Sequence, residues 1–334
     1  TDFQLAITVK QGLEEALGSN GTVLYAKGSN LMDDPAYEER ATMFDRSLKR
    51  DNRSAEEMMT EALAVANQSD IIVAALGEAS EMSGESSSRT DLGIPDAQRR
   101  LLEALLKTGK PVVLLLFAGR PMTLKWEQEH VPAILNVWFG GSEAGHAIAD
   151  VLFGDVNPSG KLTTSFPQNV GQVPIYYAHK NTGRPLGEGK WFEKFRSNYL
   201  DVSNEPLYPF GYGLSYTKFD YGKMTVSHAK PHGNQTITAS VTVSNKGDRD
   251  GKEIVQLYIR DVVGSITRPV KELKGFQKID LKAGETKTVS FTISTEDLRF
   301  YNGNLDHTWE PGDFDIMIGP DSKQVQTTRI NWTK

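Results

Sequence analysis

The fold is decided by residues 54–119, which read SAEEMMTEALAVANQSDIIVAALGEASEMSGESSSRTDLGIPDAQRRLLEALLKTGKPVVLLLFAG. The continuous apolar runs at 71–78 and 111–119 are typical of strands that are buried on both faces. A helix-like segment precedes each run, and the first such segment opens with a capping-box pattern, Ser54 followed three residues later by Glu57. Helices that alternate with buried strands predict a mostly parallel α/β sheet.

The same alternation extends in both directions along the chain. Upstream, we expect a helix over residues 2–17 and a short strand, TVLYAKG, over 22–28. Downstream, AILNVWFGG at 133–141 predicts a third buried strand, and SEAGHAIADVLFG at 142–154 predicts another helix. Glycine follows or closes several of these helical segments, as expected of helix C-termini. These elements together define a predicted α/β sandwich domain.

The second half of the chain has the pattern of an all-β domain. About seven short alternating segments in roughly 110 residues predict a β-sandwich of immunoglobulin or fibronectin type III architecture. The segments are KMTVSHA, TITASVTVSN, EIVQLYIRD, KELKGFQKIDL, TKTVSFTIS, FDIMIGP and QTTRINW. We therefore expect an α/β domain over 1–165, a connecting segment over 166–218 that is rich in Gly, Pro and aromatic residues, and a sandwich over 219–334.

Composition excludes several functional classes. The chain has no cysteine, so disulfides, thiolate catalysis and zinc–thiolate sites are absent. A net charge of −6 argues against nucleic acid as a partner, and no apolar run reaches the length of a membrane span. Neither a GxGxxG nor a Walker pattern follows the predicted strands. His228 and His232 are separated by Pro231 and do not make a helical metal site. We predict no metal or organic cofactor.

An acidic loop leaves the first buried strand at residues 77–95. It holds four carboxylates, namely Glu78, Glu81, Glu85 and Asp91. Parallel sheets bind ligands outside the carboxyl ends of their strands, so this loop lies where such a fold places function. A glutamate in a polar loop is most often simply solvated, and position alone does not separate these four acids.

Six stretches of the sequence, in order along nearly the whole chain, resemble glycoside hydrolase family 3 in its bacterial periplasmic β-glucosidase branch. They are GTVLYAKGSN, ESSSRTDLGIP, GKPVVLLLFAGRP, VWFGGSEAGHAIADVLFGDVNPSGKLTTSFP, LYPFGYGLSYTKF and RPVKELKGFQKIDLKAGET. The resemblance implies three domains in series: a barrel with an aspartate nucleophile, an α/β sandwich that lends a glutamate as acid/base, and a fibronectin type III-like domain. This sequence resembles the second and third, and the barrel and the first strand of the sandwich have no counterpart in it.

The resemblance assigns the general acid/base to Glu85. The family motif resembles GEGYDR, with arginine four residues after glutamate; here three serines separate Glu85 from Arg89. Arg89 is a candidate substrate-binding residue that would hold a sugar hydroxyl or orient Glu85, with a plain ion pair as the alternative. Glu78 is the rival acid within the loop. The aromatic residues Trp138 and Phe139 belong either to the core or to a surface that stacks on a sugar.

The expected function is that of the C-terminal portion of a retaining, exo-acting β-glucosidase. Its partners would be an oligosaccharide or aryl β-glucoside substrate and a barrel segment supplied in cis or in trans, without nucleic acid or membrane. A homo-oligomer is also possible, and the resemblance implies a periplasmic or secreted location. Alone, the chain is expected to be inactive. The alternative is a non-catalytic carbohydrate-binding or scaffold protein derived from the same fold.

Overall fold

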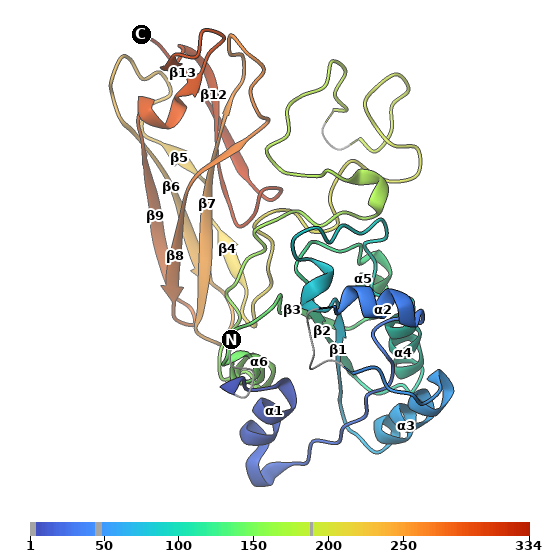
Figure 1. Cartoon of the computed structure of the whole chain (residues 1–334). Coiled ribbons are helices and arrows are strands. Elements are labelled where there is room, and N and C mark those ends of the chain that lie inside the picture. Colours follow the sequence, from blue (N-terminus) through green and yellow to red (C-terminus); the bar gives the residue numbers. More distant parts are fainter. Residues whose placement is uncertain (1–4, 44–48, 188–189) are drawn as a thin grey trace. The chain divides into compact units, whose positions relative to one another are not determined.

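The computed structural model describes residues 5–43, 49–187 and 190–334, and the chain divides into two compact units (Figure 1). The first unit comprises Thr1–Val156 and Pro167–Val173, and the second comprises Asn157–Phe166 and Pro174–Lys334. Much of the segment expected to be a connection thus packs within the second unit. The predicted domain boundaries at 165 and 218 stay a prediction.

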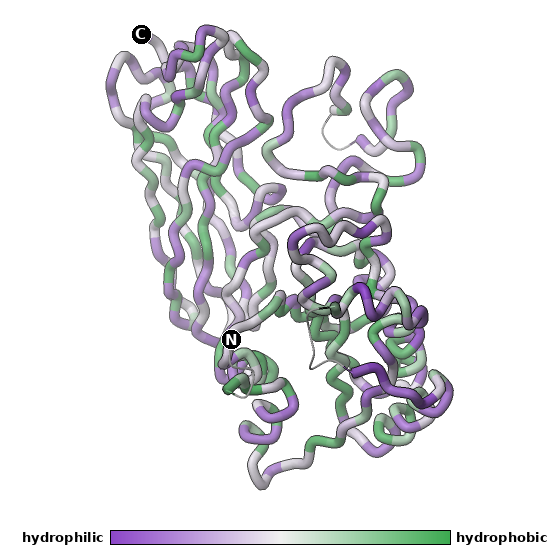
Figure 2. The backbone as a smooth tube through the Cα atoms, viewed as in Figure 1, coloured by the Kyte–Doolittle hydropathy of each residue, from purple (hydrophilic) through white to green (hydrophobic). Residues whose placement is uncertain are grey.

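The first unit is built on a parallel sheet of strands in the order β1-β2-β3. Its strands are β1 (Ile72–Gly77), β2 (Val112–Phe117) and β3 (Ala133–Asn136). The centre of β2 is completely buried, because Leu114, Leu115 and Leu116 each have 0% exposure. In Figure 2 these strands are mostly hydrophobic along their length. The predicted α/β class is confirmed, and all three predicted strands form. The predicted burial is wrong for β3, whose residues are exposed or only partly buried, because β3 is an edge strand that pairs with β2 alone among the described strands.

The helices of this unit begin and end largely where the sequence predicts. They are α1 (Val9–Leu17), α2 (Pro35–Ala41), α3 (Ala55–Asn67), α4 (Asp96–Leu106), α5 (Lys125–His130) and α6 (Ala144–Phe153). The capping box of α3 is confirmed: Ser54 Oγ accepts from the Glu57 amide at 3.2 Å, and the Glu57 carboxylate accepts from the Ser54 amide at 2.8 Å. The two short helices α2 and α5 were not predicted from the sequence pattern.

Two predicted elements near the N-terminus are wrong in part. The helix expected over 2–17 begins only at Val9, because Thr8 is extended and its hydroxyl caps the Gln11 amide; residues 1–4 lie outside the described part. The strand expected over 22–28 does not form. That segment has strand-like composition, but no strand of the described chain hydrogen-bonds to it, and a strand exists only as part of a ladder.

The second unit contains two antiparallel sheets that enclose one core. The first has the order β13-β12-β7-β8, and in the second β4, β9 and β5 pair with β6. The strands are β4 (Phe219–Tyr221), β5 (Thr225–Val226), β6 (Ile237–Asn245), β7 (Gly251–Asp261), β8 (Glu272–Leu281), β9 (Thr286–Ile293), β12 (Gly312–Gly319) and β13 (Gln326–Trp332), and a short hairpin adds β10 (Phe300–Tyr301) and β11 (His307–Thr308). All seven predicted strands are present, which confirms the sandwich.

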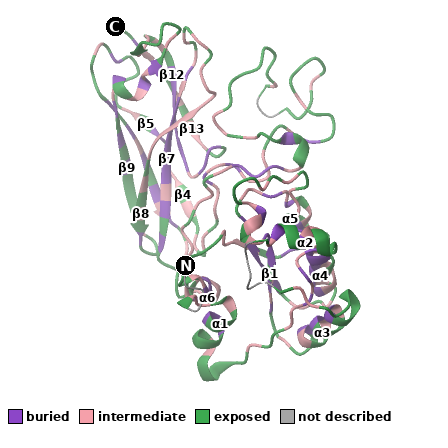
Figure 3. Ribbon diagram, viewed as in Figure 1, coloured by how far each residue is buried: buried purple, intermediate pink, exposed green. Residues whose placement is uncertain are grey.

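The sandwich core follows from alternation along the strands. On β6, buried and more exposed residues alternate through the whole strand, whereas β7 is buried over most of its length (Figure 3). Trp332, Phe314 and Ile316 are almost completely buried at the centre of the core. Short 3₁₀ helices lie in the loops of the chain, namely η2 (Gly18–Asn20), η3 (Ser80–Met82), η4 (Val170–Gln172) and η5 (Thr295–Leu298). Among the described residues, no helix is long and apolar enough to cross a membrane.

Candidate active-site loop

The acidic loop starts at Glu78, immediately after β1, and Glu78 is the buried anchor of its base. The Glu78 amide donates to the Phe117 carbonyl at the end of β2 at 2.7 Å, which extends the parallel ladder by one residue. Its side chain has 0% exposure. A buried carboxylate is tolerated only when it is paired and hydrogen-bonded, so its partners explain its place.

Two arginines neutralise Glu78. Arg89 Nη1 donates to Glu78 Oε1 at 2.8 Å, and the Arg89 side chain is only 7% exposed. Arg120, in the loop after β2, places Nε at 3.1 Å from Oε1 and 3.3 Å from Oε2 of the same carboxylate. The Gly119 amide adds a longer contact at 3.4 Å. The carboxylate therefore joins two loops at the carboxyl edge of the sheet.

Arg120 also holds the acidic loop through its backbone. Its Nη2 donates to the carbonyl of Ser87 at 2.7 Å and to the carbonyl of Met82. These two carbonyls lie on either side of Glu85 in the sequence. One guanidinium thus closes the segment 82–87 into a loop and ties it to Glu78.

Glu85 lies at the exposed tip of this segment. The Ser87 amide donates to the Gly84 carbonyl at 3.2 Å and closes a turn around Glu85 and Ser86. Among the described residues, the Glu85 carboxylate has no hydrogen bond or ion pair. The pairing of Arg89 with Glu85 considered from the sequence is absent, because Arg89 turns inward to Glu78 and donates to the Gly93 carbonyl at 3.1 Å.

The loops that follow β2 and β3 lie beside the acidic loop at the carboxyl edge of the sheet. A Cβ atom at Gly119 would lie 2.0 Å from the Ser83 hydroxyl and 3.0 Å from the Phe139 ring, so the acidic loop and the loop after β3 both pack against Gly119. Phe139 is 41% exposed and is therefore not a core residue. At the end of β3, the amide group of Asn136 is buried without a partner among the described residues.

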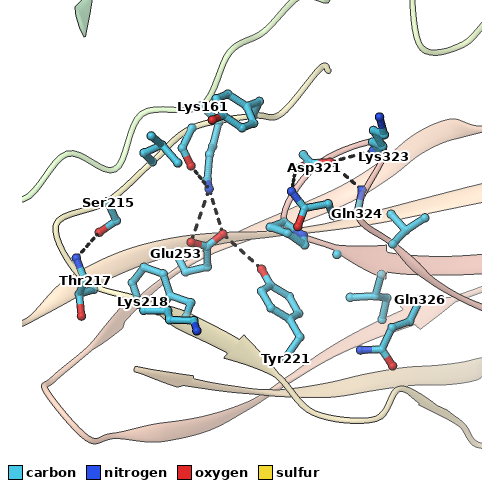
Figure 4. A pocket seen from close by; sticks show the side chains of 18 residues that line it. Lys161, Ser215, Thr217, Lys218, Tyr221, Glu253, Asp321, Lys323, Gln324 and Gln326 are labelled. Carbon is cyan, nitrogen blue, oxygen red and sulfur yellow. Dashed lines mark hydrogen bonds and ion pairs between the residues drawn. The ribbon is translucent and has the colours of Figure 1, made fainter. Parts of the chain in front are cut away.

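The second unit holds a separate cavity of about 540 Å³ (Figure 4). Lys161 Nζ lies 3.1 Å from Glu253 Oε1 and donates to the Gly213 carbonyl at 3.2 Å, and the Tyr221 hydroxyl donates to Glu253 at 3.2 Å. Burial raises the pKa of Glu253, although Lys161 opposes the shift. These groups satisfy one another and tie residues 157–166 to β7, so the arrangement is that of a structural ion pair.

Comparison with known proteins agrees with this architecture. Residues 2–216 match the glycosyl hydrolase family 3 C-terminal domain, and residues 253–322 match the fibronectin type III-like domain. The chain belongs to glycosyl hydrolase family 3. The resemblance found in the sequence is therefore confirmed.

Members of the family match the chain over nearly its whole length. The periplasmic beta-glucosidase of Salmonella typhimurium is 49% identical over 96% of this chain and 42% of its own length. A beta-xylosidase of Formosa agariphila is 40% identical over 98% of this chain and 41% of its own length. The crystal structure of beta-glucosidase from Listeria innocua in complex with isofagomine has a TM-score of 0.86 at 38% identity, covering 99% of this chain and 43% of that chain. The chain spans less than half the length of these relatives.

The sequence singled out Glu85 and Arg89, whose roles stay predictions, and it did not single out Arg120. The signal for Arg120 was present, since Gly119-Arg120-Pro121 leaves the end of a buried strand next to the acidic loop. Glu78 was considered as a rival acid. Its complete burial between two arginines instead makes it an anchor of the loop.

Proposed function

We propose that this chain supplies the general acid/base of a retaining β-glucosidase, and that Glu85 is that residue. One observation carries the proposal: Glu85 is exposed, and its carboxylate has no partner among the described residues, at the tip of a loop whose base is fixed by buried ion pairs. A carboxyl group that must serve a sugar held by another domain needs this combination of free tip and fixed base. The family membership and the relatives named as beta-glucosidases support the reaction class.

The reaction needs two carboxyl groups on either side of the scissile bond. In retaining glycosidases they stand roughly 5–5.5 Å apart; one attacks the anomeric carbon, and the other protonates the leaving oxygen and then activates water. Glu85 would perform the second role. From the resemblance we infer that the nucleophile is an aspartate on a barrel segment that acts in cis or in trans with this chain.

The substrate class follows from the same proposal. We infer an oligosaccharide or aryl glycoside that is cleaved from its non-reducing end, with β-glucosides as the first choice. A relative named as a beta-xylosidase makes aryl β-xylosides the second substrate to assay. A periplasmic location is inferred from the Salmonella relative.

The role of Arg89 is revised within this proposal. The sequence suggested contact with substrate, but its guanidinium is nearly buried and engaged by Glu78 and the Gly93 carbonyl. We infer that Arg89 holds the loop. A non-catalytic scaffold remains the alternative function, and an unpaired Glu85 on an anchored loop favours the enzyme.

The test is Glu85→Gln in the enzyme that contains this chain together with its barrel segment. We expect turnover to fall by about 10²- to 10⁴-fold, as for a lost general acid/base. The loss should be smaller for an aryl glucoside with a good leaving group, because its departure needs little protonation. Azide should restore part of the rate by replacing activated water in the second step.

The matched control is Glu81→Gln, because Glu81 lies in the same loop and has the same chemistry. It should change turnover little. An equal loss from both substitutions on every leaving group, without rescue by azide, would remove Glu85 from the acid/base role.

A further inference from the structure

One side chain, that of Arg120, binds the backbone on both sides of Glu85. Arg120 binds the Met82 and Ser87 carbonyls through Nη2 and the buried Glu78 carboxylate through Nε. Arginine suits this task because its planar guanidinium presents several donors in a fixed fork, whereas lysine offers one compact charge. The Arg120 side chain is 20% exposed, so these contacts are mostly shielded from water.

The composition of the loop makes such a fastening necessary. Residues 83–88 read SGESSS, which contain no apolar side chain that could pack the loop onto the sheet. Small polar residues of this kind have high conformational freedom, and a catalytic group loses rate when its geometry is spread over many conformations. Packing of the tip cannot supply order here, so hydrogen bonds to the backbone must supply it.

Arg89, the second arginine, stabilises the base of the loop through contacts that differ from those of Arg120. Arg89 bonds Glu78 and the Gly93 carbonyl, which lie at the base and the far end of the loop. Arg89 and Arg120 together more than offset the charge of Glu78, so no net negative charge is buried beside the sheet. A single buried charge without partners would be strongly unfavourable.

We propose that Glu78, Arg89 and Arg120 form a positioning apparatus that sets the reach of Glu85, with Arg120 as its principal member. This inference rests on the proposed function of Glu85. It assigns none of the three a contact with substrate. Their effect on catalysis passes through the backbone of residues 82–87.

The first experiment tests whether Arg120 orders residues 82–87 and does not measure activity. A protease that cleaves after glutamate is used to nick the 334-residue chain, and cleavage between Glu85 and Ser86 is followed by mass spectrometry. We expect Arg120→Met to accelerate this cleavage at least tenfold and Arg120→Lys to have an intermediate effect. Glu85→Gln removes the cleavage site and identifies the fragment. Arg100→Met, a change in an exposed arginine paired with Asp33, should leave the rate unchanged.

The second experiment examines catalysis in the enzyme that includes the barrel segment. Arg120→Met should lower kcat for substrates with poor leaving groups, on the order of 10²-fold for a displacement near 1 Å. Substrates with good leaving groups should lose much less. KM should change little, because the side chain does not touch the sugar. Arg120→Lys should restore part of kcat.

The outcomes separate the inference from the proposed function. Equal losses on all leaving groups would indicate a general loss of folded enzyme and would overturn the positioning role, as would unchanged cleavage after Glu85 in Arg120→Met. If Glu85→Gln is fully active while the Arg120 variants are cleaved faster after Glu85, then Arg120 does order the loop, but the assignment of Glu85 as the acid/base is wrong. Circular dichroism of both Arg120 variants verifies that they are folded.

Discussion

Ser86 occupies the left-handed region at the tip of the acidic loop, with φ 61°. Non-glycine residues adopt this region rarely, and it costs L-residues roughly 1–2 kcal/mol. The family motif has glycine at this position. Ser86 therefore adopts a backbone conformation that favours glycine, although its own side chain disfavours it. The strain lies next to Glu85, where a functional constraint on the backbone is expected.

The prediction at this scale compares Ser86→Val with the same substitution at Ser88. A β-branched side chain resists positive φ, so the valine variant should be less stable to urea by about 1–2 kcal/mol. Ser88→Val is the matched control, because Ser88 is an exposed loop serine without positive φ, and it should change stability by less than about 0.5 kcal/mol. Equal effects of the two valine substitutions would mean that the tip does not hold this conformation.

Single residues were predicted from the sequence as far as a local pattern defined them. The Ser54–Glu57 capping box was predicted from a four-residue motif and is confirmed. The assignment of Glu85, which the family motif and the spacing to Arg89 suggested, stays a prediction. Arg120 was missed because its contacts with Met82 and Ser87 cross 38 and 33 residues of chain. Such contacts depend on which strand ends meet at one edge of the sheet, and periodicity does not contain that information.

The helices α1 and α6 pack so closely that glycine is required at their contact. A Cβ atom at Gly145 would lie 2.2 Å from the Thr8 carbonyl oxygen, and one at Gly12 would lie 2.2 Å from the Gly145 carbonyl oxygen. The close approach allows the Ile7 amide to donate to Ser142 at 2.8 Å and the Gly145 amide to donate to Ile7 at 3.1 Å. These bonds engage the backbone of Ile7, directly before the extended cap residue Thr8, so α1 begins only at Val9.

Gly145→Ala should therefore destabilise the chain by about 1–3 kcal/mol, the usual effect of forcing extra volume into a packed contact. Gly141→Ala is the control, since a Cβ atom there would meet nothing within 4 Å. Thermal unfolding of the two variants beside the parent chain measures the difference. A neutral Gly145→Ala would show that α1 can shift along α6 without loss.

His146 makes the same helix pair sensitive to pH. Its Nε2 lies 2.7 Å from Glu15 on α1, and its Nδ1 lies 2.6 Å from Glu143. Hydrogen bonds to Glu15 and then to Glu143 raise the pKa of His146 above 6.5. A raised folded-state pKa means that its contribution to stability is complete below pH 6.5 and disappears as pH rises through the folded value.

We expect the His146 ring resonances to titrate above pH 6.5 in NMR spectra of the chain. Glu15→Gln should lower that midpoint, because it removes the partner with the largest effect. Glu14→Gln, whose carboxylate pairs with Lys10 instead, is the control. A midpoint at or below 6.5 in the parent chain would contradict the α1–α6 ion pair.

At the scale of the whole molecule, composition and periodicity predicted both architectures. Buried strands such as β1 and β2 read as continuous apolar runs, and sandwich strands such as β6 read as alternation, because burial on two faces or on one face determines those patterns. The strand expected over 22–28 does not form, because no strand of the described chain pairs with it. A strand depends on a neighbour as well as on its own residues.

The last prediction is that the 334-residue chain alone does not hydrolyse glycosides. A double-displacement reaction requires a nucleophile in addition to an acid, and a lone acid forms no glycosyl intermediate. The chain spans 42% of the Salmonella relative, and the family resemblance assigns the nucleophile to a barrel domain that has no counterpart in this sequence.

The chain is assayed on an aryl β-glucoside, first alone and then with a separately prepared barrel segment. Turnover should arise only in the mixture and should disappear with Glu85→Gln. Substantial turnover by the chain alone, abolished by changing one of its own aspartates, would place the nucleophile within these 334 residues and overturn the division of labour between the two segments.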